Sequence, residues 1–271
     1  MKYLLTIWLF WAGAAAGIAQ DDSSFRLERS YSGSVADAAL DNLGNLYVLT
    51  ASDQLKKYSP QGDSMAVYNN VRKFGKVSAL DVSNPLKVLL YYKDFSTIVV
   101  LDRLLAVRST LDLRRRNILQ ASAMSLAYDG NIWLFDAFDS KLKKVNEEGE
   151  LLLETPDFRS LFGEAVQPQQ IIDEDNLLYL YDTARGLYLF DRYGTFKRKV
   201  PVAGWSGIRP AGQQLWGITG HSLRSYNLSN LLETQYAFPA SFMPYQRFRL
   251  SHNKLLALTP DSLRIYQFPT P

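Results

Sequence analysis

The chain has 271 residues, of which 30 are Lys or Arg and 27 are Asp or Glu, so its net charge at pH 7 is only +3. A balance this even argues against a nucleic-acid partner, which would require a basic patch. The chain contains no cysteine, which excludes disulfides, thiolate chemistry and acylation of a lipoprotein cysteine. A chain of this length can bury a core large enough to fold without such cross-links.

The first 20 residues have the pattern of an export signal. Lys2 supplies a positive charge, an apolar run follows it, and Gly17-Ile18-Ala19 offers a small-x-small cleavage site. The apolar run is shorter than the about 20 residues that a spanning helix needs. We therefore expect a cleaved signal peptide over residues 1–20 and one soluble domain over residues 21–271. This domain would be exported, either to the periplasm or to the outer surface and beyond, with no transmembrane segment.

Beyond the signal, one block of sequence recurs about every 40 to 45 residues. It reads as an apolar strand, a turn containing Asp, an apolar and aromatic strand, and a further strand with Lys or Tyr that is closed by Gly. The clearest copies begin at Leu40-Asp41-Asn42-Leu43-Gly44-Asn45 and at Tyr128-Asp129-Gly130-Asn131. A repeat of this period built only from strands predicts the blades of a β-propeller.

The strands expected in the first five units are short and separated by turns rich in Asp, Asn, Gly and Pro, as tight hairpins require. In chain order these strands cover residues 35–41, 45–49, 54–59 and 63–69; 77–82, 87–92, 97–102 and 104–111; 123–128, 131–135, 141–146 and 150–154; 169–173, 177–181, 186–191 and 195–200; and 207–210, 214–218, 222–227 and 232–238. One helical turn is expected over residues 157–163.

The last unit holds only three strands, over residues 247–251, 254–258 and 262–268. The segment Phe25–Tyr31 alternates like a strand and belongs to no other unit, so we predict that it supplies the missing fourth strand. Pairing these two segments closes the ring and removes the exposed edges of the terminal units. The predicted fold class is all-β, a six-bladed β-propeller of four-stranded blades. A jelly roll or a lipocalin barrel would not produce this self-similarity.

The repeat resembles the NHL type, which reads Asp-x-x-Gly-Asn-Leu-Tyr-Val, then a polar turn, an Ile/Leu-x-Lys-Tyr strand and a Gly, as residues 41–62 do here. The second unit departs from this pattern at Asn84-Pro85, and the fifth at Ala211-Gly212-Gln213-Gln214. The run from Asn84 to Asp102 also resembles uncharacterised secreted propellers of Bacteroidetes. These resemblances imply the architecture and leave the function open.

An Asp recurs at the first turn of the units, as Asp41, Asp81, Asp129 and Asp173. One acidic residue per unit at the same place indicates carboxylates that accept backbone N–H groups of the turn, rather than ligands of a central cation. Asp136 and Asp182 follow second strands and are expected to cap the next turn. Asp136 and Asp139 could suggest calcium, but calcium takes six to eight oxygen ligands, and no calcium-binding loop pattern is present. We predict no metal and no cofactor.

No catalytic set is recognisable. The two histidines, His221 and His252, lie outside any zinc or Ser-His-Asp pattern. Six-bladed lactonases hold a metal with a Glu, Asn and Asp set at the channel mouth, and this set is not found at equivalent turns. We therefore predict no catalytic residues. The alternative that stays open is a metal-dependent hydrolase of lactonase or gluconolactonase type that uses the central channel.

A candidate binding surface lies in the loops of one face. The densest charge run is in the loop between the second and third units, on the face that propellers generally use for recognition. Exposed aromatics beside Arg and Lys are typical of partner-binding sites, although a run of arginines can equally be a solvated loop. The residues predicted for this surface are Lys93, Phe95, Arg114, Arg115, Arg116, Phe138, Arg185, Trp205 and His221. We predict a non-enzymatic binding or scaffold propeller that recognises a protein partner of the cell envelope, with a glycan as the second option.

Overall fold

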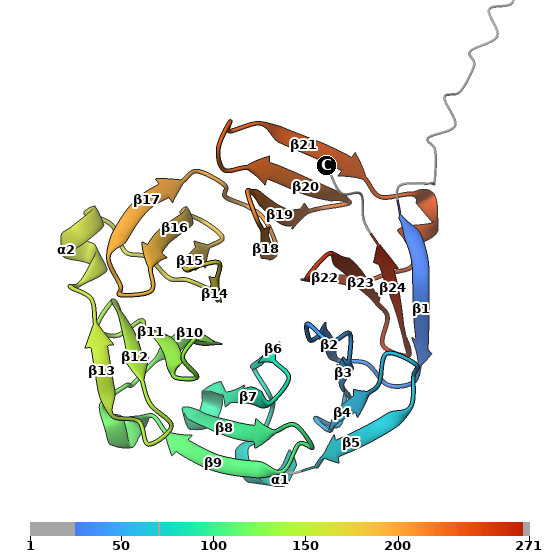
Figure 1. Cartoon of the computed structure of the whole chain (residues 1–271), viewed down its shortest axis with the longest axis horizontal. Coiled ribbons are helices and arrows are strands. Elements are labelled where there is room, and N and C mark those ends of the chain that lie inside the picture. The colour runs from blue at the N-terminus through green and yellow to red at the C-terminus, as the bar shows by residue number, and fades with distance from the viewer. Residues whose placement is uncertain (1–24, 70, 268–271) are drawn as a thin grey trace, which may run out of the picture.

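The computed structural model of the chain describes residues 25–69 and 71–267. Within these ranges, 24 strands form six antiparallel sheets of four strands each, arranged as blades in a ring (Figure 1). The all-β, six-bladed propeller predicted from the repeat is confirmed. The predicted signal peptide lies outside the described residues. No helix in the described ranges is long and apolar enough to cross a membrane.

Each blade contains four consecutive strands, except that the sixth also takes the first strand of the chain. The strands of blades 1 to 3 are β2 (Asp37–Leu40), β3 (Leu46–Leu49), β4 (Leu55–Tyr58) and β5 (Ser64–Tyr68); β6 (Ala79–Asn84), β7 (Lys87–Tyr92), β8 (Thr97–Asp102) and β9 (Val107–Asp112); and β10 (Ala121–Leu126), β11 (Ile132–Asp136), β12 (Lys141–Val145) and β13 (Leu151–Glu154). Those of blades 4 to 6 are β14 (Gln170–Glu174), β15 (Leu177–Asp182), β16 (Gly186–Asp191) and β17 (Phe196–Val200); β18 (Ile208–Ala211), β19 (Gln214–Thr219), β20 (Ser222–Asn227) and β21 (Glu233–Ala237); and β22 (Arg247–Ser251), β23 (Lys254–Leu258), β24 (Ser262–Gln267) and β1 (Arg26–Ser32).

The ring closes through the pairing of the two ends of the described chain. β1 runs antiparallel to β24, with Arg26 opposite Gln267 and Ser32 opposite Ser262. The order of the sheet is β1-β24-β23-β22, so β1 is the outermost strand of blade 6. The prediction that residues 25–31 complete the last unit is therefore confirmed, and this pairing holds the ring shut.

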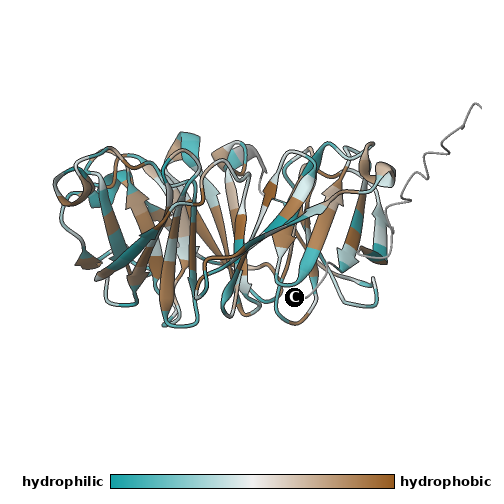
Figure 2. Cartoon of the chain, turned by 90° about the horizontal axis from the view of Figure 1, so that it is seen from above, coloured by the Kyte–Doolittle hydropathy of each residue, from teal (hydrophilic) through white to brown (hydrophobic). Residues whose placement is uncertain are grey.

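The hydrophobic core lies between the blades. β7 is buried at all its positions, because the blades on either side cover both of its faces. Side chains alternate along a strand, and accordingly Leu89 and Tyr91 pack with residues of blade 3 while Leu90 and Tyr92 pack with residues of blade 1. Hydrophobic residues run through the strands, whereas the turns are mostly hydrophilic (Figure 2).

The predicted helical turn is present as α2 (Phe158–Phe162). Its N-cap Asp157 accepts a hydrogen bond from the N–H of Arg159, and it ends at Gly163, whose positive φ of 67° suits glycine. Phe158 is fully buried between blades 3 and 4. A second short helix, α1 (Val71–Phe74), was not predicted, and 3₁₀ turns occupy Lys93–Phe95, Arg114–Arg116 and Ala240–Phe242.

Asp41, Asp81 and Asp129 each accept an N–H of their own turn, as predicted, whereas Asp173 lies within β14 and accepts from blade 3 instead, which corrects the prediction for that residue. Asp41 Oδ1 accepts the N–H groups of Leu43 (3.0 Å) and Asn45 (2.8 Å), as predicted for a turn. Asp81 Oδ2 also accepts from the Ser125 hydroxyl (2.9 Å) and the Leu126 N–H (2.8 Å) of blade 3. From the other side, Asp173 Oδ2 accepts from Trp133 Nε1 (3.0 Å) and from the N–H of Tyr128 (3.2 Å). These two carboxylates therefore tie blade 3 to both of its neighbours.

Candidate functional site

The loop that carries the three arginines is fixed against a turn of its own blade. Arg114 Nη2 donates to the carbonyl of Asp94 (2.9 Å), and its Nε donates to the Ser96 hydroxyl (3.3 Å). Leu113 and Ile118 anchor the two ends of the loop, because both side chains are buried in the core between blades 2 and 3. The structure therefore brings Lys93 and Phe95, which lie in the β7–β8 turn, next to the arginine loop.

The same loop extends the surface to the next blade. The N–H of Ala137 donates to the carbonyl of Gln120 (2.8 Å), which joins the β11–β12 turn of blade 3 to the loop. Phe138 in that turn is 63% exposed, Phe95 is 51% exposed, and Leu119 between them is exposed to a similar extent. The blade 2–3 surface, as we define it, consists of Lys93, Phe95, Arg115, Leu119 and Phe138.

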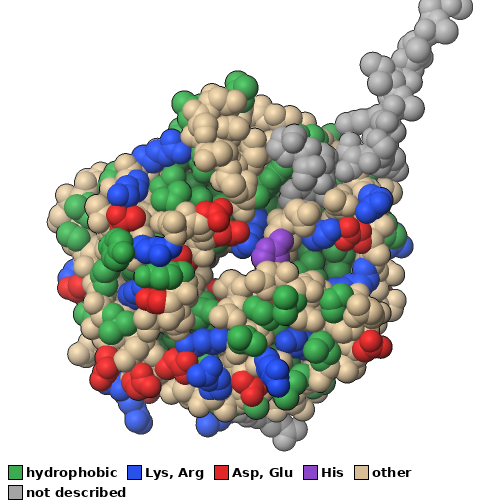
Figure 3. Space-filling view, in the orientation of Figure 1, with side chains coloured by type: hydrophobic (Ala, Val, Ile, Leu, Met, Phe, Trp, Pro, Cys, Tyr) green, Lys and Arg blue, Asp and Glu red, His purple; other side chains and the backbone are tan. Residues whose placement is uncertain are grey.

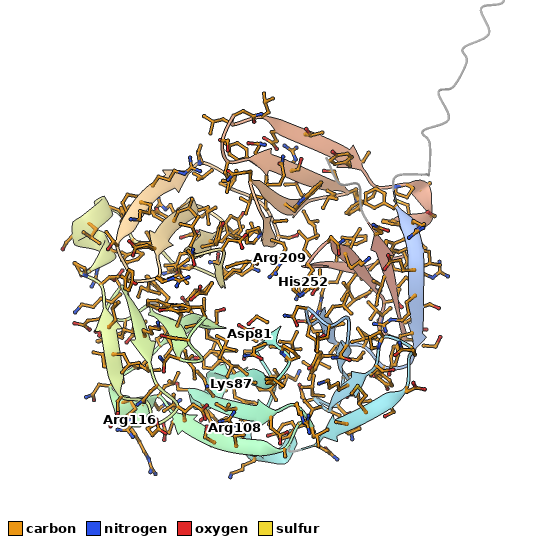
Figure 4. The ribbon with its side chains drawn as sticks, in the orientation of Figure 1. Asp81, Lys87, Arg108, Arg116, Arg209 and His252 are labelled. Atoms are coloured by element: carbon orange, nitrogen blue, oxygen red, sulfur yellow. The ribbon has the colours of Figure 1, made fainter. Side chains whose placement is uncertain are left out.

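The three arginines do not contribute equally to this surface. Arg114 is committed to Asp94 and Ser96. Arg116, at the outer rim beside the end of β9 (Figure 4), lies so close to Gly149 that a Cβ at that glycine would be 2.7 Å from Arg116 Cγ. Arg115 is 85% exposed and contacts only Asp112, at 3.3 Å. Arg115 and Arg116 are therefore the exposed cations of the loop, Arg115 with one exposed ion pair and Arg116 at the outer rim.

Two other predicted residues lie on different blades. Arg185 forms an ion pair with Glu164 (3.0 Å), and Glu164 also accepts from Lys199 Nζ and the Tyr188 hydroxyl (both 2.6 Å). The hydrogen bond from Lys199 is the main reason that the pKa of Glu164 is lowered. Arg185 thus belongs to an ion-pair network of blade 4. His221 is exposed in the β19–β20 turn of blade 5.

Trp205 is not part of a surface, which corrects the prediction. Its side chain is only 3% exposed and packs in the core between blades 4 and 5. Its backbone is held by the Tyr181 hydroxyl, which accepts from the Trp205 N–H (2.8 Å) and donates to the Trp205 carbonyl (3.0 Å). The indole lies against Gly217, where a Cβ would come within 1.7 Å of its ring. The tryptophan therefore stabilises the irregular fifth blade.

Replacing Gly217 by Ala should lower the free energy of unfolding by about 1 to 3 kcal/mol, as is usual for overpacking. The added methyl group would displace the Trp205 ring from its place in the core. Urea unfolding monitored by tryptophan fluorescence measures the change. The matched control is Gly207→Ala on the same blade, since the nearest atom to a Cβ there is 3.9 Å away. A Gly217→Ala variant as stable as the control would contradict this packing.

A second candidate site is the central channel. The innermost strands enclose a cavity of about 660 Å³, and the space-filling view shows an opening with a histidine at its rim (Figure 3). Arg209 of β18 and His252 of the β22–β23 turn lie side by side there, with Asp81 on the blade 2 side (Figure 4). Sequence reasoning placed none of these residues in a common site.

Arg209 links three blades at this opening. Its Nη2 donates to Glu174 Oε2 of blade 4 (2.8 Å) and lies 3.2 Å from His252 Nδ1 of blade 6. Because an arginine is always a donor, His252 Nδ1 accepts, and the imidazole carries its proton on Nε2. Burial, together with the Arg209 charge, lowers the pKa of His252 to about 4, so the ring is neutral at pH 7. Burial also raises the pKa of Glu174.

This histidine should make stability depend on pH. In the folded protein its pKa is about 4, against 6.5 when unperturbed, so the unfolded chain binds more protons in between. Stability is therefore fully present above pH 6.5 and falls as the pH drops toward 4. Between pH 6.5 and pH 4, the free energy of unfolding of His252→Gln should therefore fall by about 1 to 2 kcal/mol less than that of the wild type, after allowance for solvent screening. Urea unfolding at both pH values measures it. His221→Gln is the control, because His221 is exposed, and it should behave like the wild type. Equal pH dependence in all three proteins would show that His252 is not its source.

The residues described offer little for a metal. No group of three or more His, Asp or Glu side chains suited to a metal ion occurs within residues 25–69 and 71–267. The Asp136 and Asp139 pair, which could have suggested calcium, holds the Lys143 ammonium instead, at 2.9 Å and 2.5 Å. Asp136 Oδ1 caps the turn by accepting the Phe138 N–H (3.1 Å), and Asp182 caps its turn in the same way through the Ala184 N–H (2.8 Å), as predicted.

Comparison with known proteins shows the fold and no family. No protein-family model matches the sequence, and no curated protein matches it. Among solved structures, the WD40 domain of Pan2 from Neurospora crassa has a TM-score of 0.64 and 10% identity over 93% of this chain and 97% of that chain.

Two further structures are similar to a comparable degree. A catalytically inactive variant of virginiamycin B lyase from Staphylococcus aureus, with quinupristin, has a TM-score of 0.60 and 11% identity over 89% of this chain and 99% of that chain. The N-terminal part of BBS1, in complex with ARL6DN, has a TM-score of 0.58 and 12% identity over 91% and 97% of the two chains. At such low identities, these similarities establish that the chain is a β-propeller and nothing further.

Proposed function

We propose that the chain is a non-enzymatic binding propeller that docks a protein partner on the blade 2–3 surface. The observation that carries the proposal is the exposure of Phe95, Leu119 and Phe138 in the arginine loop and in the two turns that hydrogen bonds join to it, where Arg115 is also exposed. Aromatic residues and arginine dominate the binding energy of protein interfaces. Scattered exposed apolar side chains are common on monomers, as Leu104 and Tyr193 show here; what favours a partner is that Phe95, Leu119 and Phe138 lie in three loops that hydrogen bonds join beside exposed cations.

The surface is also rigid, which favours binding. Its loop is fixed to the two adjacent turns by Arg114 and by the backbone bond from Ala137 to Gln120, and Ile118 anchors it in the core. A preformed surface loses little conformational entropy when a partner binds. Lys93 and Arg115 add positive charge beside the apolar groups, so the complementary partner would present acidic residues around an apolar segment.

The export signal expected over residues 1–20 would place this partner in the cell envelope. Like the export signal, the NHL-type identity of the repeat and its resemblance to secreted propellers of Bacteroidetes stay predictions from the sequence. Support for protein binding by this architecture comes from the similar domain of BBS1, which is in complex with ARL6DN. The architecture also serves an enzyme, the similar virginiamycin B lyase, but the residues described include no group of three or more His, Asp or Glu side chains that could hold the metal of a metal-dependent hydrolase.

The test is retention of a partner by variants of this surface. The triple variant Phe95→Ser, Leu119→Ser, Phe138→Ser removes the three apolar groups. Its control, Leu104→Ser, Tyr193→Ser, Leu231→Ser, removes three equally exposed groups from the β8–β9, β16–β17 and β20–β21 turns. Immobilised proteins are incubated with native envelope extract, and bound proteins are quantified by mass spectrometry.

We expect the wild type and the control to retain the same partner in a stoichiometric amount. The surface variant should retain at least about tenfold less, since a lost hot spot costs more than 1 kcal/mol. Circular dichroism of each variant checks that the fold is intact. Equal retention by both triple variants, or no retained protein at all, would contradict the proposal.

A further inference from the structure

The wall of the channel consists largely of unpaired strand edges. β2, β6, β10, β14, β18 and β22 each stand at the end of their sheet's strand order, so one edge of each has no strand partner. Backbone N–H and C=O groups on such an edge require water or a ligand. Small side chains on these strands, such as Ala39, Ala79 and Ser122, leave the cavity open between them.

Some of these edge groups are already used to join the blades. Gln170 Nε2 donates to the Ile208 carbonyl (3.0 Å), and its Oε1 accepts from the Ile208 N–H (2.9 Å). The Ser251 hydroxyl serves the carbonyl (2.8 Å) and the N–H (3.0 Å) of Leu40 in the same way. Polar side chains here satisfy the backbone of a neighbouring blade, as Asp81 also does for the Leu126 N–H and Tyr91 for the Ala121 carbonyl. Only the edge groups that remain are available to a ligand.

Side chains on the wall also have unused hydrogen-bonding capacity. Ser122 lines the cavity, and its Oγ, which is buried without a partner, can serve a ligand there only by rotating about χ1 toward the cavity. Glu174 engages Arg209 through Oε2, which leaves Oε1 as an acceptor, and His252 engages Arg209 through Nδ1, which leaves Nε2–H as a donor. The wall therefore offers both donors and acceptors, as recognition of hydroxyl groups requires.

The charge of the wall limits the kind of ligand. Three carboxylates line the cavity, namely Asp81, Asp173 and Glu174, against the two cations Arg209 and Lys93. His252 adds no charge at pH 7, because its pKa is about 4. The lining thus carries one negative charge in excess, which disfavours anions.

We propose that the channel binds a small uncharged or cationic molecule that is rich in hydroxyl groups and about the size of a disaccharide. A cavity of about 660 Å³ lies within the range of small-molecule sites, about 300 to 1,000 Å³. Backbone edges, serine hydroxyls and the free atoms of Glu174 and His252 supply the hydrogen bonds. This site lies on the channel axis and shares only Lys93 with the blade 2–3 surface.

Methyl NMR of the methionines tests the proposal on the intact protein. Met124 lines the cavity, whereas Met65 on β5 and Met243 are exposed elsewhere and serve as internal references. The probes are cellobiose, which is uncharged, the disaccharide of glucosamine, which is cationic, and digalacturonic acid, which is anionic. Met124→Leu assigns the resonance.

The Met124 signal should shift with cellobiose or with the glucosamine disaccharide and not with digalacturonic acid, while Met65 and Met243 stay unchanged. Ser122→Val should weaken binding at least about fivefold, the effect of one lost hydrogen bond. The control Ser64→Val, on the outer strand β5, should bind as the wild type does, as should the surface triple variant. A Met124 signal unmoved by every probe, a shift with the anion alone, or full binding by Ser122→Val would overturn the proposal.

Discussion

Replacing Lys143 by Met should lower the free energy of unfolding by about 3 to 5 kcal/mol, the usual effect of breaking a buried ion pair. The Lys143 ammonium lies 2.9 Å from Asp136 Oδ2 and 2.5 Å from Asp139 Oδ2. Burial acts to lower the pKa of Lys143, but its two carboxylate partners raise it overall. Because the Asp136 side chain is fully buried, removal of the lysine leaves a carboxylate without a cation in the core of blade 3.

Equilibrium urea unfolding measures this loss. Lys141→Met on the same strand is the matched control, since its bridge to Glu154 (2.9 Å) is partly exposed and should contribute no more than about 1 kcal/mol. The double variant Asp136→Asn, Lys143→Met should recover part of the lost stability, because it removes the uncompensated charge. A Lys143→Met variant no less stable than Lys141→Met would show that the pair is not a structural element.

Replacing Phe158 by Ala should cost about 3 to 5 kcal/mol, as expected for a buried phenylalanine. Its ring is fully buried, with centroids 5.1 Å from Phe135 of blade 3 and 5.4 Å from Phe190 of blade 4. A third ring, that of Phe162, lies 5.1 Å away within α2. The truncation leaves a cavity between the two blades and frees α2 from its anchor.

Thermal and urea unfolding give the size of this effect. Phe138→Ala is the control, because that ring is exposed and its removal should change stability by less than about 0.5 kcal/mol. Near-ultraviolet circular dichroism reports whether the remaining aromatic cluster repacks. If both alanine variants unfolded at the same urea concentration, the packing of Phe158 between blades 3 and 4 would not be a main source of stability.

The architecture could be predicted because it depends on local patterns that repeat. Every hairpin needs turn residues at its ends, and the ring needs a complement for the three-strand final unit. Residues 25–31 were the available segment, and β1 indeed pairs with β24. The turn role of Asp41 was equally visible, because its partners Leu43 and Asn45 are its neighbours in sequence.

Contacts between blades could not be predicted from a single repeat. Asp81 and Asp173 correspond to Asp41 in the repeat, yet they lie within β6 and β14, and the Oδ2 atom of each reaches blade 3. Trp205 resembled a surface aromatic because its loop is rich in Gly and Ser, but the missing side chain of Gly217 provides its place in the core. The contact of the Trp205 indole with Gly217 forms only when blade 5 has folded.

The candidate sites show the same limit. The arginine loop was recognised from its charge, but the engagement of Arg114 depends on Asp94 and Ser96, which belong to another turn. Leu119 was missed, although the adjacent pair Ile118 and Leu119 in a polar loop carried a signal. Ile118 is buried and Leu119 is exposed, so the pair holds both the anchor of the loop and a surface apolar group. The contacts of Arg209 with Glu174 and His252 join three blades, so no stretch of sequence could reveal them.

Site-specific photo-crosslinking in the producing cell tests most directly whether a partner docks on the blade 2–3 surface. A photoreactive amino acid is placed at Leu119, and in a matched protein at Leu104, which is exposed in the β8–β9 turn. We predict a discrete cross-linked product of one partner from position 119 and none from position 104. The same product from both positions, or none from position 119, would contradict a partner that docks on this surface.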